Sequence, residues 1–251
     1  MYGWRARVGL ILPHVNTTAE PEFNRLAPAG VSFHVARMLI PELTVDGLIA
    51  MGQETERAAL ELADLNASAI CFCCTSGSFI KGAGYDVELA ERIKKVTGAP
   101  ATATSVAVVE ALRLLGLTRV AMVTPYEDAV NEREVAFLDS YGIEVVKFRG
   151  LGIGPRLPMF PLAGRSVSHI GLQEPSVAYN LAKKVMTPEA EGLFISCTNF
   201  RTIEVLDALE RELEVPVVSA NQATFWSAMR LAGVREEIDG YGSLLRRLGT
   251  G

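Results

Sequence analysis

Two of the four cysteines in this chain lie in the same local pattern, in which a thiol can act as a nucleophile or a proton donor. Cys74 follows the apolar run 69–73 and precedes Thr75-Ser76-Gly77, a hydroxyl- and glycine-rich turn typical of the start of a helix. Cys197 follows the apolar run 192–196 and again precedes a threonine. Backbone N–H groups at a helix start favour an anion, so we expect a lowered pKa for the Cys74 thiol and a reactive thiolate.

For all four cysteines the alternative is a purely structural role in the core. A buried free cysteine usually behaves as a small apolar side chain, and we interpret Cys71 and Cys73, inside the apolar run, in this way. Cys74 and Cys197 taken singly have the same alternative, but their matching positions favour a catalytic pair. Neither the cysteines nor the three histidines have the paired turn spacing of a zinc site, so we predict no metal.

Polar side chains follow two further apolar runs. In the segment 12–18, Asn16 either caps the next helix or holds a substrate carboxylate. His14 is a candidate base, although a lone histidine in a loop is weak support for that role. In the loop 125–128, Tyr126 either packs in the core or supplies a phenolic O–H group.

The elements that must position these side chains are apolar runs that alternate with amphipathic stretches. This alternation predicts an α/β fold with mostly parallel sheets, because strands covered on both faces are continuously hydrophobic. The predicted strands are 8–12, 31–37, 69–73, 101–104, 120–124, 144–148, 192–196 and 215–219. The predicted helices are 47–65, 86–97, 105–115, 129–141, 175–186 and 202–212. Residues 149–165, rich in glycine and proline, are interpreted as a connection or a cover over the site.

The chain repeats itself at long range. Residues 7–13 are echoed by 119–125, and residues 99–105 are echoed by 215–221. The two Cys-Thr pairs fall between these matches in the same order, so the repeat predicts two similar Rossmann-like half-domains.

The predicted division places residues 1–112 plus 222–251 in the first lobe and residues 113–221 in the second. Ligands of open α/β sheets bind beyond the carboxyl ends of the strands. The active site is therefore expected in the cleft between the lobes, with Cys74 and Cys197 on opposite walls.

Composition excludes several classes of protein. Half of the 251 residues are hydrophobic (49%), which argues against disorder, and the net charge of −5 argues against a nucleic-acid or anionic-membrane partner. No apolar segment reaches the length of a membrane span, and the first residues lead directly into a strand without a signal peptide. Three clustered cysteines in a chain of this size fit reduced thiols and a cytoplasmic location. Apolar helical faces lead us to expect a homodimer.

Several segments together resemble the aspartate/glutamate racemase superfamily, and within it most of all the maleate cis–trans isomerases, with the arylmalonate decarboxylases as close relatives. The segments that carry this resemblance are 12–18, 74–79, 123–126, 130–133 and 196–199. The resemblance implies a two-lobed, cofactor-free enzyme that binds a small dicarboxylate between its lobes.

The resemblance also assigns roles to individual residues. It implies that Cys74 attacks an alkene carbon and that Cys197 is the proton donor and acceptor. It places Asn16 and Tyr126 against substrate carboxylates, and Thr75 and Ser76 where the decarboxylases bind a dioxyanion. With the backbone of Thr198 added, the predicted substrate-binding residues are Asn16, Thr75, Ser76, Tyr126 and Thr198.

The resulting prediction is a maleate cis–trans isomerase that forms fumarate. Cysteine at position 74 favours isomerase chemistry because the decarboxylases carry glycine there, whereas His14 departs from the small serine that is usual in the isomerases. One alternative is an arylmalonate-type decarboxylase or a racemase that acts through an enediolate. Another is a non-catalytic carboxylate-binding protein.

Overall fold

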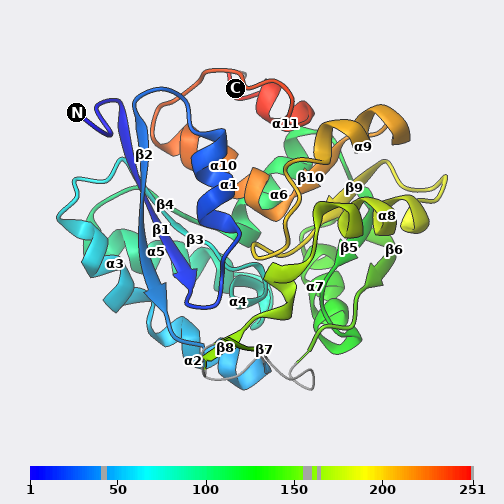
Figure 1. The fold of residues 1–251 in the computed structure, drawn as a ribbon, viewed down its shortest axis with the longest axis horizontal. Helices are drawn as coiled ribbons and strands as arrows, with labels where there is room; N and C mark the ends of the chain where they lie inside the picture. Colours follow the sequence, from blue (N-terminus) through cyan, green and yellow to red (C-terminus); the bar gives the residue numbers. More distant parts are fainter. Residues whose placement is uncertain (41–43, 155–159, 163–164, 250–251) are drawn as a thin grey trace.

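Two parallel four-stranded sheets form the framework of the molecule (Figure 1). The computed structural model describes residues 1–40, 44–154, 160–162 and 165–249. The first sheet has the order β2-β1-β3-β4, and the second has the order β10-β9-β5-β6. The strands of the first sheet are β1 (Ala6–Pro13), β2 (Val31–Met38), β3 (Ala69–Phe72) and β4 (Ala101–Ala103). Those of the second are β5 (Arg119–Thr124), β6 (Glu144–Gly150), β9 (Gly192–Ile195) and β10 (Val217–Ser219).

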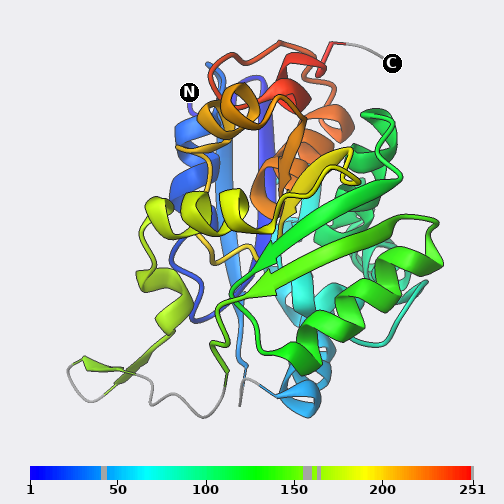
Figure 2. The same cartoon turned by 90° about the vertical axis from the view of Figure 1, so that its right-hand side faces the viewer.

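Helices cover both sheets, and the two lobes lie side by side in Figure 1, whereas the second lobe stands in front of the first in Figure 2. In the first half they are α1 (Ala19–Leu26), α2 (Val45–Gln53), α3 (Thr55–Ala63), α4 (Thr75–Phe79), α5 (Tyr85–Thr97) and α6 (Thr104–Leu114). In the second they are α7 (Asp128–Ser140), η1 (His169–Leu172), α8 (Pro175–Val185), α9 (Leu206–Leu213), α10 (Ala220–Leu231) and α11 (Ser243–Arg246). An antiparallel pair, β7 (Phe160–Leu162) and β8 (Arg165–Val167), lies apart from both sheets.

The strand order confirms the repeat. β1 pairs with β2 and β3, and β3 pairs with β4. In the same way β5 pairs with β6 and β9, and β9 pairs with β10. Each predicted strand is present, with ends that differ by at most a few residues. The two halves therefore have one topology used twice, as the matched segments of the sequence predict.

The helix α10 begins at the predicted lobe boundary near residue 221. This helix follows β10 of the second sheet, yet it packs against α6 and against β3 and β4 of the first lobe. The capping box of Ser219 with Gln222 starts the helix at this crossover. The division of the chain into two lobes at 112 and 221 stays a prediction.

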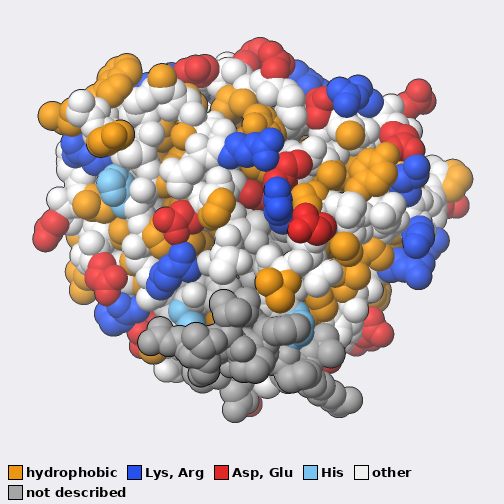
Figure 3. Space-filling model, viewed as in Figure 1, with side chains coloured by type: hydrophobic (Ala, Val, Ile, Leu, Met, Phe, Trp, Pro, Cys, Tyr) orange, Lys and Arg blue, Asp and Glu red, His pale blue; other side chains and the backbone are white. Residues whose placement is uncertain are grey.

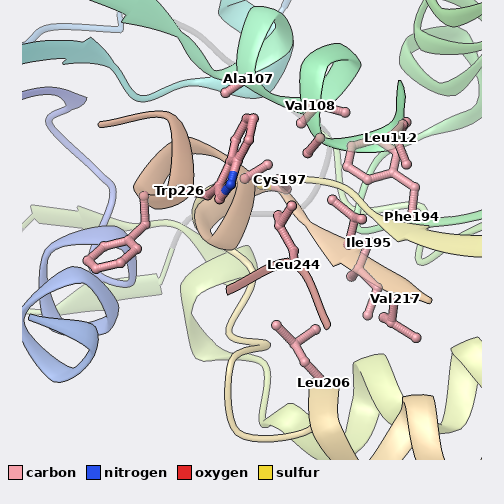
Figure 4. Close-up of a cluster of buried hydrophobic side chains, with 14 of the residues drawn as sticks. Ala107, Val108, Leu112, Phe194, Ile195, Cys197, Leu206, Val217, Trp226 and Leu244 are labelled. Carbon is pink, nitrogen blue, oxygen red and sulfur yellow. The ribbon is translucent and has the colours of Figure 1, made fainter. Parts of the chain in front are cut away.

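One hydrophobic core crosses from the first lobe to the second (Figure 4). Its buried members include Leu10 and Phe23 from the first lobe and Val120 and Ile195 from the second. Because helices cover both faces of each sheet, β3 and β9 are buried at every residue. The labelled cluster in Figure 4 brings Cys197 together with α6 and α10 side chains such as Ala107 and Trp226.

The sequence predicts one helix at 47–65, whereas the structure has two. α2 begins after Thr44, whose hydroxyl accepts the Gly47 N–H at 3.1 Å, and the helix ends at Glu54. The helices α1, η1, α10 and α11 and the β7–β8 pair are absent from the predicted elements. Part of the predicted cover at 149–165 lies outside the described residues, which resume at β7.

None of the described helices is long and apolar enough to span a membrane. Charged side chains of both signs are dispersed over the face shown in Figure 3.

Candidate active site

A cavity of about 240 Å³ lies between the lobes, and the predicted site residues meet there. Its polar walls come from the segments that follow β1, β3, β5 and β9, which are the carboxyl ends of the inner strands of both sheets. All seven predicted catalytic or substrate-binding residues line it: Asn16, Cys74, Thr75, Ser76, Tyr126, Cys197 and Thr198.

Cys74 is the N-cap residue of α4. Its extended backbone (φ −150°) lets the Sγ atom accept the Gly77 N–H at 3.3 Å, and the Ser76 hydroxyl lies 3.9 Å from the same sulfur. A Cβ atom on Gly77 would lie 3.0 Å from this sulfur and 2.7 Å from Met51 Cε. Glycine is therefore the residue that lets the backbone approach the thiol.

The expected lowering of the Cys74 pKa is wrong. Burial disfavours the thiolate and raises the pKa of Cys74 to about 11, although the Gly77 N–H and the Ser76 hydroxyl act in the opposite direction. Two hydrogen bonds from a five-residue helix do not offset the loss of water around a sulfur in an apolar pocket.

Cys197 has a different backbone. Its φ of +88° lies in the left-handed region, which side chains other than glycine rarely adopt. The Tyr126 hydroxyl and the Asn199 N–H both hydrogen-bond its sulfur, yet burial raises the pKa of Cys197 to about 12. A charge on Cys74 raises it further, which shows that the two thiols interact across the cavity. With pKa values of about 11 and about 12, Cys74 is the easier of the two to ionise.

Asn16 has the first of the two roles considered for it, at the start of the next helix, and it also lines the cavity, where its contact with a substrate carboxylate stays a prediction. Its Oδ1 atom accepts the N–H groups of Thr18 and Ala19, both at 3.0 Å, at the start of α1. Its Nδ2 atom donates to Thr198 Oγ1 at 3.1 Å, and that hydroxyl donates to Cys73 O at 3.2 Å. The side chain thus lines the cavity while it ties the lobes together beneath the two cysteines.

Comparisons with known proteins agree with this geometry. The family model described as arylmalonate decarboxylase matches residues 8–245. The chain belongs to the arylmalonate decarboxylase family. It is 31% identical over 240 residues to the arylmalonate decarboxylase of Bordetella bronchiseptica, covering 94% of this chain and 95% of that one. It is also 31% identical over 251 residues to the maleate isomerase of Nocardia farcinica, covering 96% of each.

A solved structure resembles the whole chain. It is the Nocardia farcinica maleate cis–trans isomerase in a cysteine-to-serine variant with a covalently bound succinylcysteine intermediate. It superposes with a TM-score of 0.87 at 26% identity and covers 96% of this chain and 98% of its own.

The wall around Tyr126 is held by backbone contacts. Its carbonyl oxygen accepts the Gly152 N–H at 3.1 Å and Asn131 Nδ2 at 3.3 Å. A Cβ atom on Gly150 would lie 2.4 Å from the same carbonyl oxygen. The segment 150–154 is therefore a packed wall that ends at the cavity with Ile153 and Gly154.

Apart from these residues, the cavity is lined mostly by apolar side chains. Among the described residues no lysine, arginine or histidine lines it, and its one acidic residue is Glu127. The Thr75 hydroxyl is buried there without a hydrogen-bond partner in the structure. Among the described residues, the groups that the cavity offers to a carboxylate are therefore N–H and O–H dipoles. The apolar lining consists of Pro13, Val15, Ile40, Val45, Leu48, Ala129, Val130, Ile153 and Ile170.

Other sequence candidates lie outside the cavity. His14 is exposed, and its Nδ1 atom accepts the Ile40 N–H at 3.2 Å. Its ring therefore positions the backbone at Ile40. Burial lowers the pKa of His14. Cys71 and Cys73 are fully buried, and the Cys73 thiol donates to the Cys71 carbonyl oxygen at 3.4 Å. All four cysteines are free.

Sequence reasoning missed the buried acid Glu134. It lies on α7, and its Oε1 atom accepts the Ser196 hydroxyl at 2.6 Å. Ser196 is the residue directly before Cys197 in the sequence. Its position shares a helix face with the buried residues Asn131, Phe137 and Leu138. The sequence did contain a signal for this residue, because Glu134 falls at the helical spacing of the residues that form the buried face of α7.

Proposed function

We propose that this protein is a cofactor-independent maleate cis–trans isomerase that uses two cysteines. The observation that carries the proposal is the meeting of Cys74 and Cys197, one from each lobe, in a single small cavity. The succinylcysteine of the structurally similar Nocardia isomerase supports the same chemistry.

Cys74 acts as the nucleophile. After the thiol has lost its proton to solvent, the Sγ atom forms a bond to C2 of maleate, and the electron pair of the double bond moves toward C3 and the adjoining carboxylate. Cys197 gives its thiol proton to C3, so a succinyl thioether results and the C2–C3 bond rotates as a single bond. The Cys197 thiolate then takes the proton back, the double bond forms again, and the carbon–sulfur bond breaks to release fumarate.

The developing negative charge is stabilised by fixed donors. The first N–H groups of a helix have no acceptor within it, which leaves Thr75 and Ser76 N–H at the start of α4 for the substrate. The Tyr126 hydroxyl lines the same cavity. Removal of one such donor typically raises the barrier by about 3 kcal/mol.

The decisive experiment follows fumarate formation from maleate without added metal or cofactor. Cys74→Ala and Cys197→Ala should both abolish turnover, whereas Cys73→Ala, which alters a neighbouring thiol outside the cavity, should retain it. Thermal unfolding of each variant separates a chemical loss from a folding defect. Full activity in either of the first two variants would exclude that cysteine from the reaction.

The apolar lining favours a second candidate, decarboxylation of a substituted malonate. Nine apolar residues face the cavity and would accommodate an aryl or alkyl group. In that reaction Cys197 would protonate the enediolate that remains after carbon dioxide leaves. Release of carbon dioxide from phenylmalonate, with no turnover of maleate, would favour this candidate over the isomerase. Inertness toward both acids, with measurable binding of either, would indicate a carboxylate-binding protein.

The predictions of a homodimer, of a cytoplasmic location and of no nucleic-acid or membrane partner are retained as part of this proposal. Analytical ultracentrifugation tests the first of them.

A further inference from the structure

The acid Glu134 is buried against Ser196, the residue that precedes the second cysteine. Its side chain is 1% exposed, and its Oε1 atom accepts the hydroxyl of Ser196, the residue before Cys197. Its Oε2 atom is buried and has no hydrogen-bond partner in the structure. A carboxyl group with one oxygen unpaired in a dry interior is costly to ionise and needs a reason to be there.

The ionisable groups around this acid are those of the reaction. Cys197 follows the end of β9 and Tyr126 the end of β5, and a charge on Glu134 raises the pKa of both. Cys74 lies across the cavity at the start of α4 and interacts with the same two groups. In the described part of the chain, Glu134 forms no ion pair.

We propose that Glu134 controls the release of the proton on Cys197. While the Glu134 carboxyl is protonated, Cys197 can give its proton to the substrate carbon, and the electron pair of the S–H bond stays on sulfur. Once Glu134 is ionised, the thiolate formed in that step would be a second negative charge in the same dry pocket. Coulomb repulsion between them then opposes the step. Glu134 is thus a positioning residue that acts through Cys197, and this role rests on the proposed function.

The acid is placed to change state in the range where the enzyme would operate. Burial raises the pKa of Glu134 to about 8, and the Ser196 hydroxyl opposes that rise by stabilising the carboxylate. Below that pH the acid is mostly neutral, and above it the acid is mostly charged. The structure therefore predicts that its influence on Cys197 is confined to alkaline pH.

Glu134→Gln tests this directly, because the amide has the shape of the acid and never ionises. In a Cys74→Ala background, iodoacetamide labelling of Cys197 is measured by mass spectrometry at about pH 7 and about pH 10. We expect equal rates with and without Glu134→Gln at the lower pH and about tenfold faster labelling in Glu134→Gln at the higher pH, which corresponds to one pH unit in the thiol pKa. The matched control is Glu132→Gln, an exposed glutamate on the same helix, which should change neither rate.

Ser196→Ala provides a second variant. Without the hydroxyl the carboxylate loses its donor, so the acid should stay neutral to higher pH and Cys197 labelling at about pH 9 should rise. Equal labelling in Glu134→Gln and its parent at both pH values, or the same change at both, would overturn the proposal, since a packing defect has no pH dependence. A pH-confined change in a protein that does not isomerise maleate would uphold the role of Glu134 and refute the isomerase function. In an active enzyme, the ratio of Glu134→Gln to wild-type turnover should grow from near one to about tenfold across the same range.

Discussion

The two cysteine-bearing strand ends share one topology but differ in local structure. After β3 the chain is extended at Cys74 and turns into α4, so that the sulfur accepts a backbone N–H at 3.3 Å. After β9 the chain takes a left-handed conformation at Cys197, and no helix follows until α9 at Leu206. In that half the sulfur is held by the hydroxyl of Tyr126 and the N–H of Asn199.

This difference gives the two thiols different chemistry. A sulfur at a helix N-cap is suited to carry negative charge, whereas one next to a second thiol and a buried acid is better kept as S–H. The raised pKa values follow the same order, about 11 for Cys74 and about 12 for Cys197. In the proposed mechanism, a duplicated scaffold would thus supply one nucleophile and one acid because its two strand ends continue differently.

The largest effect on turnover and adduct formation should come from replacing Cys74 and Cys197 in turn by serine. Cys197→Ser leaves the nucleophile intact, so incubation with maleate should yield a covalent adduct on Cys74 heavier by one molecule of maleic acid. Cys74→Ser should give no adduct, and both variants should lose about four orders of magnitude or more in turnover. Intact-protein mass spectrometry provides the measurement. An adduct on Cys197 instead would reverse the assigned roles.

Tyr126→Phe should have the next largest effect. The substitution removes the hydroxyl that contacts Cys197 and leaves the ring in the wall. We expect kcat for maleate to fall about 100-fold to 1000-fold, as for the loss of one charge-stabilising donor. Adduct formation at Cys74 in a Cys197→Ser background should persist. A change in KM alone would restrict Tyr126 to substrate binding.

Labelling of the two thiols should separate them by about one order of magnitude. Thiolate is the reactive form, and for a pKa above the working range its fraction increases with pH. Alkylation of Cys74 should therefore accelerate about tenfold per pH unit between about pH 7 and pH 10, and Cys74 should react about tenfold faster than Cys197 at about pH 7. The ratio of the two rates should increase at alkaline pH as Glu134 ionises. A plateau for Cys74 near neutral pH would instead support the lowered pKa expected from the sequence.

The smallest effect should be a difference in melting temperature between the Cys197→Gly and Cys74→Gly variants. At Cys197 the backbone φ of +88° costs an L-residue roughly 1–2 kcal/mol, which glycine does not incur. At Cys74 glycine only removes the sulfur cap and adds chain entropy. Cys197→Gly should therefore unfold at a higher temperature than Cys74→Gly. Equal melting temperatures would show that the left-handed turn is not strained.

Much of this molecule could be predicted from the sequence, because its signals are local. Apolar runs mark all eight strands of the two sheets, and polar residues after four of them mark the cavity. The break at Glu54 escaped prediction because an amphipathic pattern continues across it from α2 to α3. α10 is almost wholly buried, so its sequence lacks the polar stripe that reveals a surface helix.

The features of the site that escaped prediction depend on contacts between distant residues. The sulfur pKa values are set by burial, which no local motif reports. Glu134 lies 62 residues in sequence from its partner Ser196. Asn16 lies 182 residues from its partner Thr198. The left-handed Cys197 has no marker either, because glycine or asparagine would be the expected residue there.

The apolar interior that runs through both lobes makes the repeat indivisible. Side chains from β1, β5 and β9, with α6 and α10 between the sheets, belong to one buried cluster. A chain cut at residue 112 would expose that interior on both fragments. The smallest assembly able to rebuild the pocket is then the two complementary fragments refolded together, and the intact chain should melt in a single calorimetric transition.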